Sequence, residues 1–174
     1  LLERRAGINQ GNSNHGATPL LMAAGGGHTD VTRLLLKKRA NPNQATTDQA
    51  SVTPLQLASK LGHLSVVELL LNHGAEDNAC TPLAPAARDH GQQALLLAAQ
   101  NGHLDVCKAL LDHHVNPNAT QHPTGATPLA KAAQHQHLQV VELLLARQAD
   151  VHKGTTIKGA TPLYMAAEAG HTRV

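Results

Sequence analysis

The chain has 174 residues, of which 41% are hydrophobic, so it has enough apolar side chains to bury a core and is not expected to be disordered. Its formal net charge of +2 is too small to predict nucleic-acid binding. Aromatic residues make up 1% of the chain, so a core would consist of Leu, Val and Ala, which suits closely packed helices better than a sandwich or barrel.

The two cysteines, Cys80 and Cys107, lack the spacing of a disulfide framework or a zinc site. This favours a reducing, intracellular setting, most simply the cytoplasm. The cell would be the protein's own or, if the protein is a secreted effector, a host cell. No stretch is long and apolar enough to cross a bilayer, and the N-terminus lacks a signal-peptide pattern. Because the sequence begins with Leu1 rather than Met, we expect any targeting segment to lie outside it.

The phrase Thr-Pro-Leu recurs along the chain, at residues 18–20, 53–55, 127–129 and 161–163. A degenerate copy at residues 93–95 is identified by the Ala-Ala and Gly-His pairs that follow it at the same distances, so the copies begin 34 to 40 residues apart. Thr as an N-cap accepts a backbone N–H, and Pro at the next position has no N–H to leave unpaired. Each copy therefore predicts the start of a helix.

This first helix is predicted to end at a Gly-His pair, found at residues 27–28, 62–63, 102–103 and 170–171, because Gly tolerates the left-handed backbone of a tight turn. A second amphipathic helix follows, with apolar residues at helical spacing such as Val31, Leu34 and Leu35. Polar, turn-rich segments such as residues 41–48 then return the chain to the next Thr-Pro through a projecting hairpin.

Gly-x-Thr-Pro-Leu followed in order by Ala-Ala, Gly-His and Leu-Leu-Leu resembles the ankyrin repeat family. The resemblance implies an all-α repeat solenoid of helix-turn-helix units with projecting β-hairpin loops, spanning residues 1–174. We place the end of a preceding repeat at 1–10, complete repeats at 16–49, 50–78, 91–124 and 125–158, an enlarged finger loop at 79–90 and a partial repeat at 159–174.

The sequence departs from the family pattern at two positions of the repeat. The His that commonly follows Thr-Pro-Leu is replaced, unit by unit, by Leu21, Gln56, Leu96, Ala130 and Tyr164. The Gly that closes the second helix survives only as Gly74, and the residues in its place are Arg39, His114 and Gln148. Each of these three is expected to cost about 1 kcal/mol if its φ is positive.

Thirteen histidines raise the question of a metal site. Five of them occupy the Gly-His position of the resemblance: His28, His63, His103, His137 and His171. The close pairs His113-His114 and His135 with His137 lack a converging Cys or carboxylate, so we predict no metal and no cofactor. We expect Cys107 to be buried, and no Ser, Cys or Asp has a base beside it in a recognisable motif, so we predict no catalytic residue and no enzyme activity.

The resemblance implies a scaffold that binds a partner protein through the concave surface formed by the hairpin tips and the exposed positions of the first helices. The predicted contact residues are Thr47, Asp48, Ser51, Gln56, Ser59, Lys60, Gln100, Asn101, Lys131, Gln134, His135, Thr156, Lys158, Tyr164 and Glu168. Tyr164 is the expected hot spot because aromatic anchors dominate interface energetics. We expect a monomer within a longer repeat array, with a protein partner and neither nucleic acid nor membrane.

Two other roles stay open at this point. The array could be a structural spacer or an autoinhibitory module of a larger protein, with no independent partner. It could also be a modification substrate, because the resemblance places Asn9, Asn43 and Asn118 where the family's hydroxylated asparagine can occur.

Overall fold

The computed structural model describes residues 7–75, 92–121, 123–156 and 158–172. The predicted enlarged finger loop at 79–90, together with Cys80, lies outside these ranges, as does most of the repeat end expected at 1–10.

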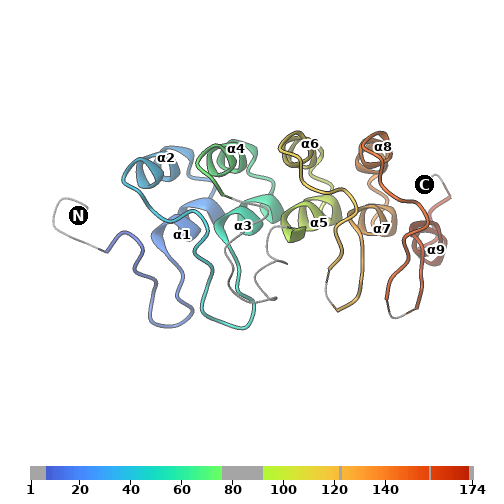
Figure 1. The fold of residues 1–174 in the computed structure, drawn as a ribbon, viewed down its shortest axis with the longest axis horizontal. Coiled ribbons are helices and arrows are strands. Elements are labelled where there is room, and N and C mark those ends of the chain that lie inside the picture. The colour runs from blue at the N-terminus through green and yellow to red at the C-terminus, as the bar shows by residue number, and fades with distance from the viewer. Residues whose placement is uncertain (1–6, 76–91, 122, 157, 173–174) are drawn as a thin grey trace.

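The described helices form two parallel rows (Figure 1). The inner row consists of the first helix of each unit, namely α1 (Pro19–Gly25), α3 (Pro54–Leu61), α5 (Gln92–Gln100), α7 (Pro128–Gln134) and α9 (Pro162–Glu168). The outer row consists of the second helices α2 (Thr29–Lys37), α4 (Leu64–Asn72), α6 (Leu104–Asp112) and α8 (Leu138–Ala146). Helices of one row pack against the next of that row, and each outer helix packs against the inner helix of its own unit. The predicted all-helical repeat solenoid is therefore confirmed.

Four inner helices begin as their sequence predicts. The side-chain oxygens of the Thr residues before Pro accept a hydrogen bond from the amide three residues later, at Thr18, Thr53, Thr127 and Thr161. At Thr53 the bond is reciprocated, because Gln56 Oε1 accepts from the Thr53 amide at 3.1 Å and completes a capping box.

The turn between the two helices of a unit requires a left-handed residue, and Gly27, Gly62, Gly102 and Gly170 adopt φ between +67° and +78° there. A Cβ atom added at the first three would come 2.6 to 2.8 Å from the ring Nδ1 of the histidine of the following unit. At these three turns glycine therefore serves both the backbone conformation and the close approach of the next unit.

The histidine after each turn ties its unit to the preceding one. His63 Nε2 lies 3.0 Å from Gly25 O, His103 Nε2 3.0 Å from Lys60 O, and His137 Nε2 3.0 Å from Gln100 O. The bond from His171 Nε2 to Gln134 O, at 2.9 Å, repeats the pattern. The four carbonyls belong to equivalent positions near the ends of the inner helices, so one hydrogen bond recurs along the stack.

The core is a continuous layer between the rows, built from Leu, Val and Ala. The small alanines of the inner helices, for example Ala58, Ala98 and Ala132, are fully buried and allow neighbouring helices to approach closely. Cys107 is buried in this layer as predicted, and burial raises the pKa of its thiol to about 12.

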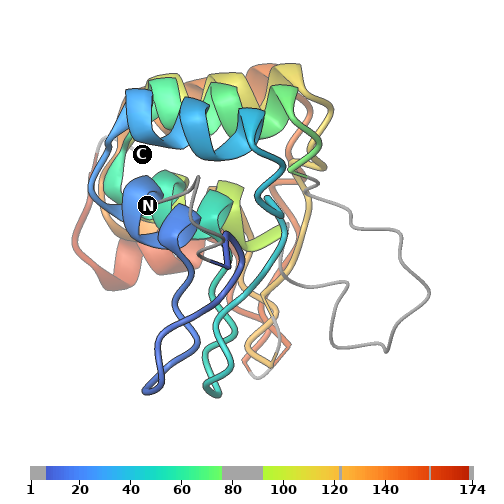
Figure 2. The same ribbon diagram turned by 90° about the vertical axis from the view of Figure 1, so that its left-hand side faces the viewer.

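The connecting loops project together from one side of the helices (Figure 2). Backbone hydrogen bonds between equivalent residues close these loops. In the first loop Asn12 N donates to Ala17 O at 3.0 Å, and in the last loop Thr155 N donates to Ala160 O at 3.0 Å. Within the described ranges no strand forms, and Gln121 with Ala126 makes an isolated bridge. The prediction of β-hairpins is therefore not confirmed, because the pairing does not extend into a ladder. No helix in these ranges is long and apolar enough to cross a membrane.

Candidate protein-binding face

Every inner helix leaves the same three positions accessible to solvent. Counted from the residue at the Thr position, the third, fourth, sixth and seventh residues are buried in the first four units. The fifth, eighth and ninth share one side of the helix, as spacings of three and four residues require, and are exposed or half-buried throughout. We call this surface the inner face. It consists of Met22, Gly25, Gly26, Leu57, Lys60, Leu61, Leu97, Gln100, Asn101, Lys131, Gln134, His135, Met165, Glu168 and Ala169.

The inner face carries accessible Met and Leu side chains over its first three units, beside the polar Lys60, Gln100 and Asn101. Met22 and Leu61 are exposed, while Leu57 and Leu97 are half-buried. Leu57 packs over the preceding unit, since a Cβ atom at Gly25 would come within 2.7 Å of Leu57 Cδ2. Accessible Met and Leu side chains on neighbouring helices provide an adaptable apolar surface for a partner.

The fourth unit makes the inner face polar. Lys131 Nζ donates to Gln134 Oε1 at 3.3 Å, and the His135 ring stacks on that of His137 with centroids 6.2 Å apart. The pKa of His135 lies below its ordinary value, first because partial burial disfavours the charged form and second because Lys131, His137 and His171 place positive charge near it. Lys131 is therefore the cation that this part of the face presents near pH 7.

The projecting loops support one another. The Thr47 amide donates a hydrogen bond to His15 O of the preceding loop at 2.9 Å. Thr156 makes two hydrogen bonds to the loop before it. Its amide donates to Thr124 O at 3.0 Å, and its hydroxyl donates to Pro123 O at 2.7 Å. Asp48 accepts a hydrogen bond from the Thr46 hydroxyl at 2.7 Å, which lowers the pKa of its carboxyl group.

The arrangement combines a fixed order of residues in each unit, paired helices in two rows, and one accessible face lined by the inner row. A family model described as Ankyrin repeats (3 copies) matches residues 1–81 and 80–155, which is most of the sequence. The chain belongs to the ankyrin repeat family. Ankyrin repeats are in general protein-protein interaction modules, and proteins built from them are typically non-enzymatic scaffolds. No curated protein matches the sequence.

On this ankyrin array, seven of the predicted contact residues lie on the inner face: Lys60, Gln100, Asn101, Lys131, Gln134, His135 and Glu168. Thr47, Asp48, Ser51, Thr156 and Lys158 lie on the projecting loops as predicted, and all but the half-buried Ser51 are exposed. Their contact with a partner stays a prediction. The apolar members of the inner face, Met22, Leu57, Leu61, Leu97 and Met165, were missed, although their fifth and ninth positions in the repeat could have identified them.

Two predicted contact residues of the ankyrin array are placed wrongly, because Gln56 and Ser59 are at most 1% exposed. Gln56 stands at the fourth position counted from the Thr, where the other three of the first four units have Leu21, Leu96 and Ala130. Ser59 stands at the seventh position, where they have Ala24, Ala99 and Ala133. All six of these residues are buried. Polarity was taken as a sign of exposure, but neighbouring units cover these positions whatever residue they carry.

Tyr164 is exposed, but for a different reason than predicted. It occupies the same fourth position, whose other residues are 5% exposed or less, and it is 53% exposed because no further helix pair covers α9 in the structure. Tyr164 therefore lies on the end of the ankyrin stack and not on the inner face.

Two further hypotheses from the sequence concern a metal site and the modification of three asparagines. Among the described residues, no three His, Cys, Asp or Glu side chains are grouped to hold a metal ion. The asparagines considered for modification join successive turns, since Asn9 Oδ1 accepts from Asn41 N at 2.8 Å and Asn118 Oδ1 accepts from Asp150 N at 2.7 Å. Asn43 Nδ2 donates to Gly74 O at 3.0 Å, and the modification of all three stays a prediction.

Proposed function

We propose that this ankyrin repeat chain is a protein-protein interaction scaffold whose partner lies along the inner face, between the helices and the projecting loops. The observation that carries the proposal is the continuity of the inner face across the described units. The same three positions are accessible in every described unit, while the positions beside them are buried in the first four.

The side chains of the inner face indicate what such a partner presents. Apolar groups would contact Met22, Leu57, Leu61 and Leu97, because burying exposed apolar surface contributes about 25 cal/mol per Å². A carboxylate or another hydrogen-bond acceptor would meet Lys131, a half-buried residue whose ammonium group donates to Gln134. The proposed partner is therefore a segment with apolar residues followed by an acidic or polar one.

The test is affinity capture from cell lysate with three forms of the chain. The inner-face variant carries Leu61→Asp and Lys131→Glu, and the control carries the same chemical changes on the outer row, Leu34→Asp and Lys108→Glu. All four side chains are exposed or half-buried, so circular dichroism should show equal helicity. We expect a protein retained by the parent and the control but lost by the inner-face variant.

Retention by all three forms would place the binding surface elsewhere. Capture of nothing by any form would instead favour the spacer or autoinhibitory role, in which the inner face has no independent partner.

A further inference from the structure

The inner face of the fourth unit differs from that of the third at two of its three positions. Lys131 and His135 of the fourth unit stand where the third unit has Leu97 and Asn101, and both units keep a glutamine between them. Lys131 and His135 are four residues apart on α7, so they lie on the same side of the helix. Because the third unit folds with neutral side chains here, the repeat does not require the lysine or the histidine.

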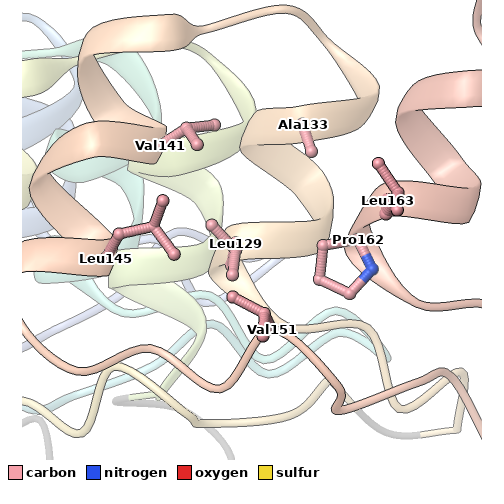
Figure 3. A pocket seen from close by; sticks show the side chains of 7 residues that line it. All are labelled: Leu129, Ala133, Val141, Leu145, Val151, Pro162 and Leu163. Atoms are coloured by element: carbon pink, nitrogen blue, oxygen red, sulfur yellow. The ribbon is translucent and has the colours of Figure 1, made fainter. Parts of the chain in front are cut away.

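The opposite side of α7 is buried and apolar. Leu129 and Ala133 are at most 3% exposed and line an apolar space together with Val141 of α8 (Figure 3). This packing fixes the rotation of α7 about its axis. The accessible side of the helix is therefore held toward the inner face.

Two further imidazoles lie close to His135 and are held by backbone carbonyls. The His135 ring stacks on that of His137, with centroids 6.2 Å and planes 19° apart. His137 Nε2 lies 3.0 Å from Gln100 O, and His171 Nε2 lies 2.9 Å from Gln134 O. Because a carbonyl oxygen only accepts, Nε2 carries the proton in both rings. The ring of His135 makes no hydrogen bond within the described part of the chain, so its nitrogens are available to a ligand.

The helices packed on α7 leave this basic cluster without a paired acid. α5 has no charged side chain, α8 has Glu142 on the outer row, and α9 has Glu168. Neither Lys131 nor His135 forms an ion pair in the ranges that the structure describes. Partial burial, and then Lys131 and the two neighbouring histidines, lower the pKa of His135, so its imidazole is neutral near pH 7.

We propose that Lys131 and His135 together bind a carboxylate of the partner and that this binding takes up a proton from solution. The inference rests on the proposed function, because it assigns the acidic group of the partner to one place on the inner face. Near pH 7 the ammonium group of Lys131 attracts the carboxylate. A carboxylate beside an imidazole favours the protonated ring, so His135 gains a proton on binding and donates an N–H to the carboxylate.

The affinity should therefore rise as the pH falls. The bound carboxylate raises the pKa of His135 above its value in the free chain. The gain in affinity begins as the pH falls through the pKa of the complex and is complete below the pKa of the free chain. Uptake of one proton limits the gain to about tenfold per pH unit. The carboxyl group of the partner has a pKa of about 4 and stays ionised over most of this range.

Two synthetic peptides of opposite chain direction are the probes, Leu-Ser-Ser-Leu-Ser-Ser-Glu-Glu and Glu-Glu-Ser-Ser-Leu-Ser-Ser-Leu. Three extended residues span about 10 Å, close to the distance between packed helices, so a leucine can contact α5 while a glutamate reaches α7. Each peptide carries a rhodamine dye at its N-terminus and an amidated C-terminus. In anisotropy titrations, the affinity of at least one peptide should rise about tenfold between about pH 7.5 and about pH 5.5. The same peptide with Gln-Gln in place of Glu-Glu should change less than about twofold.

Variants of the chain assign the proton. His135→Asn introduces the residue that the third unit has, and it should reduce the gain at the lower pH to less than about twofold. His113→Asn is the matched control, because His113 is exposed on the outer row, and it should keep the tenfold gain. Lys131→Leu should weaken binding at both pH values. Circular dichroism at both pH values should show that all forms are equally helical.

The proposal is overturned if neither peptide binds at the lower pH, if the affinity is the same at both pH values, or if His135→Asn keeps the gain. Loss of the gain in His113→Asn would also overturn it, because the proton would then belong to another histidine. The lysate capture compares variants at a single pH. It can therefore identify a partner on the inner face when the pH effect is absent, which separates a failure of this inference from a failure of the proposed function.

Discussion

Five residues other than glycine have a positive φ in the described part of the chain, and four of them stand where another unit has glycine. Arg39, His114 and Gln148 adopt φ of +63° to +65° after the outer helices, where Gly74 has +76°. The condition stated from the sequence is therefore met, and each of these side chains is expected to cost about 1 kcal/mol. Gln136, at +60°, is the equivalent case in the turn between α7 and α8.

The substitution Gln136→Gly should therefore stabilise the fold by about 1 kcal/mol, because glycine adopts this conformation without the Cβ conflict. The free energy of unfolding, measured by urea denaturation with far-UV circular dichroism, checks it. Gly102→Ala should have the opposite and larger effect, since its Cβ would lie 2.6 Å from His137 Nδ1. A neutral or destabilising Gln136→Gly would contradict this reading of the turn.

Thr32 Oγ1 and Ser59 Oγ are buried without a hydrogen-bond partner, as far as the described residues show. The equivalent positions carry Val67, Cys107 and Val141 in the case of Thr32, and Ala24, Ala99 and Ala133 in the case of Ser59. Thr32→Val and Ser59→Ala should each raise the free energy of unfolding by about 1 kcal/mol, because a buried unpaired hydroxyl is lost and the fold already accepts the replacement. As a control in the same denaturation series, Thr18→Ala should lower it by about 1 kcal/mol through loss of an N-cap.

At the scale of the helices, units are joined by packing of the two rows and by the recurring histidine bond to the preceding inner helix. Such contacts between neighbours stabilise a repeat array whose single units cannot bury a core alone. The sequence analysis assigned these histidines to the repeat but did not find their partners. The partner is a backbone carbonyl 37 to 43 residues earlier, which no local pattern indicates.

His103→Ala should destabilise the array by about 1 to 2 kcal/mol, because it leaves the Lys60 carbonyl without this partner and opens space beside Gly62. His28→Ala is the matched control, since His28 stands at the same position of the first unit and is exposed. Thermal denaturation should separate the two variants by several degrees. Equal melting temperatures would show that the histidine bond contributes little to coupling between units.

At the scale of the whole molecule, α6 lies between α4 and α8, and Cys107 is covered on both sides. With its pKa raised to about 12, the thiol is almost entirely protonated at pH 8, and alkylation requires the thiolate. In a Cys80→Ser variant, N-ethylmaleimide should therefore modify Cys107 at least a hundredfold more slowly than an unfolded-chain thiol. The rate should rise together with the fraction of unfolded protein in urea. Rapid modification in the absence of urea would show that the outer row opens locally around α6.

The repeat phrases alone determined the helix starts, the turns, the alternation of two helices and the family, because capping, left-handed turns and helical spacing are local properties of a few neighbouring residues. Only the tertiary structure decided which polar residues are covered. Gln56 and Ser59 are buried, and Leu61 and Leu163 are exposed, because burial depends on whether another unit packs on that side.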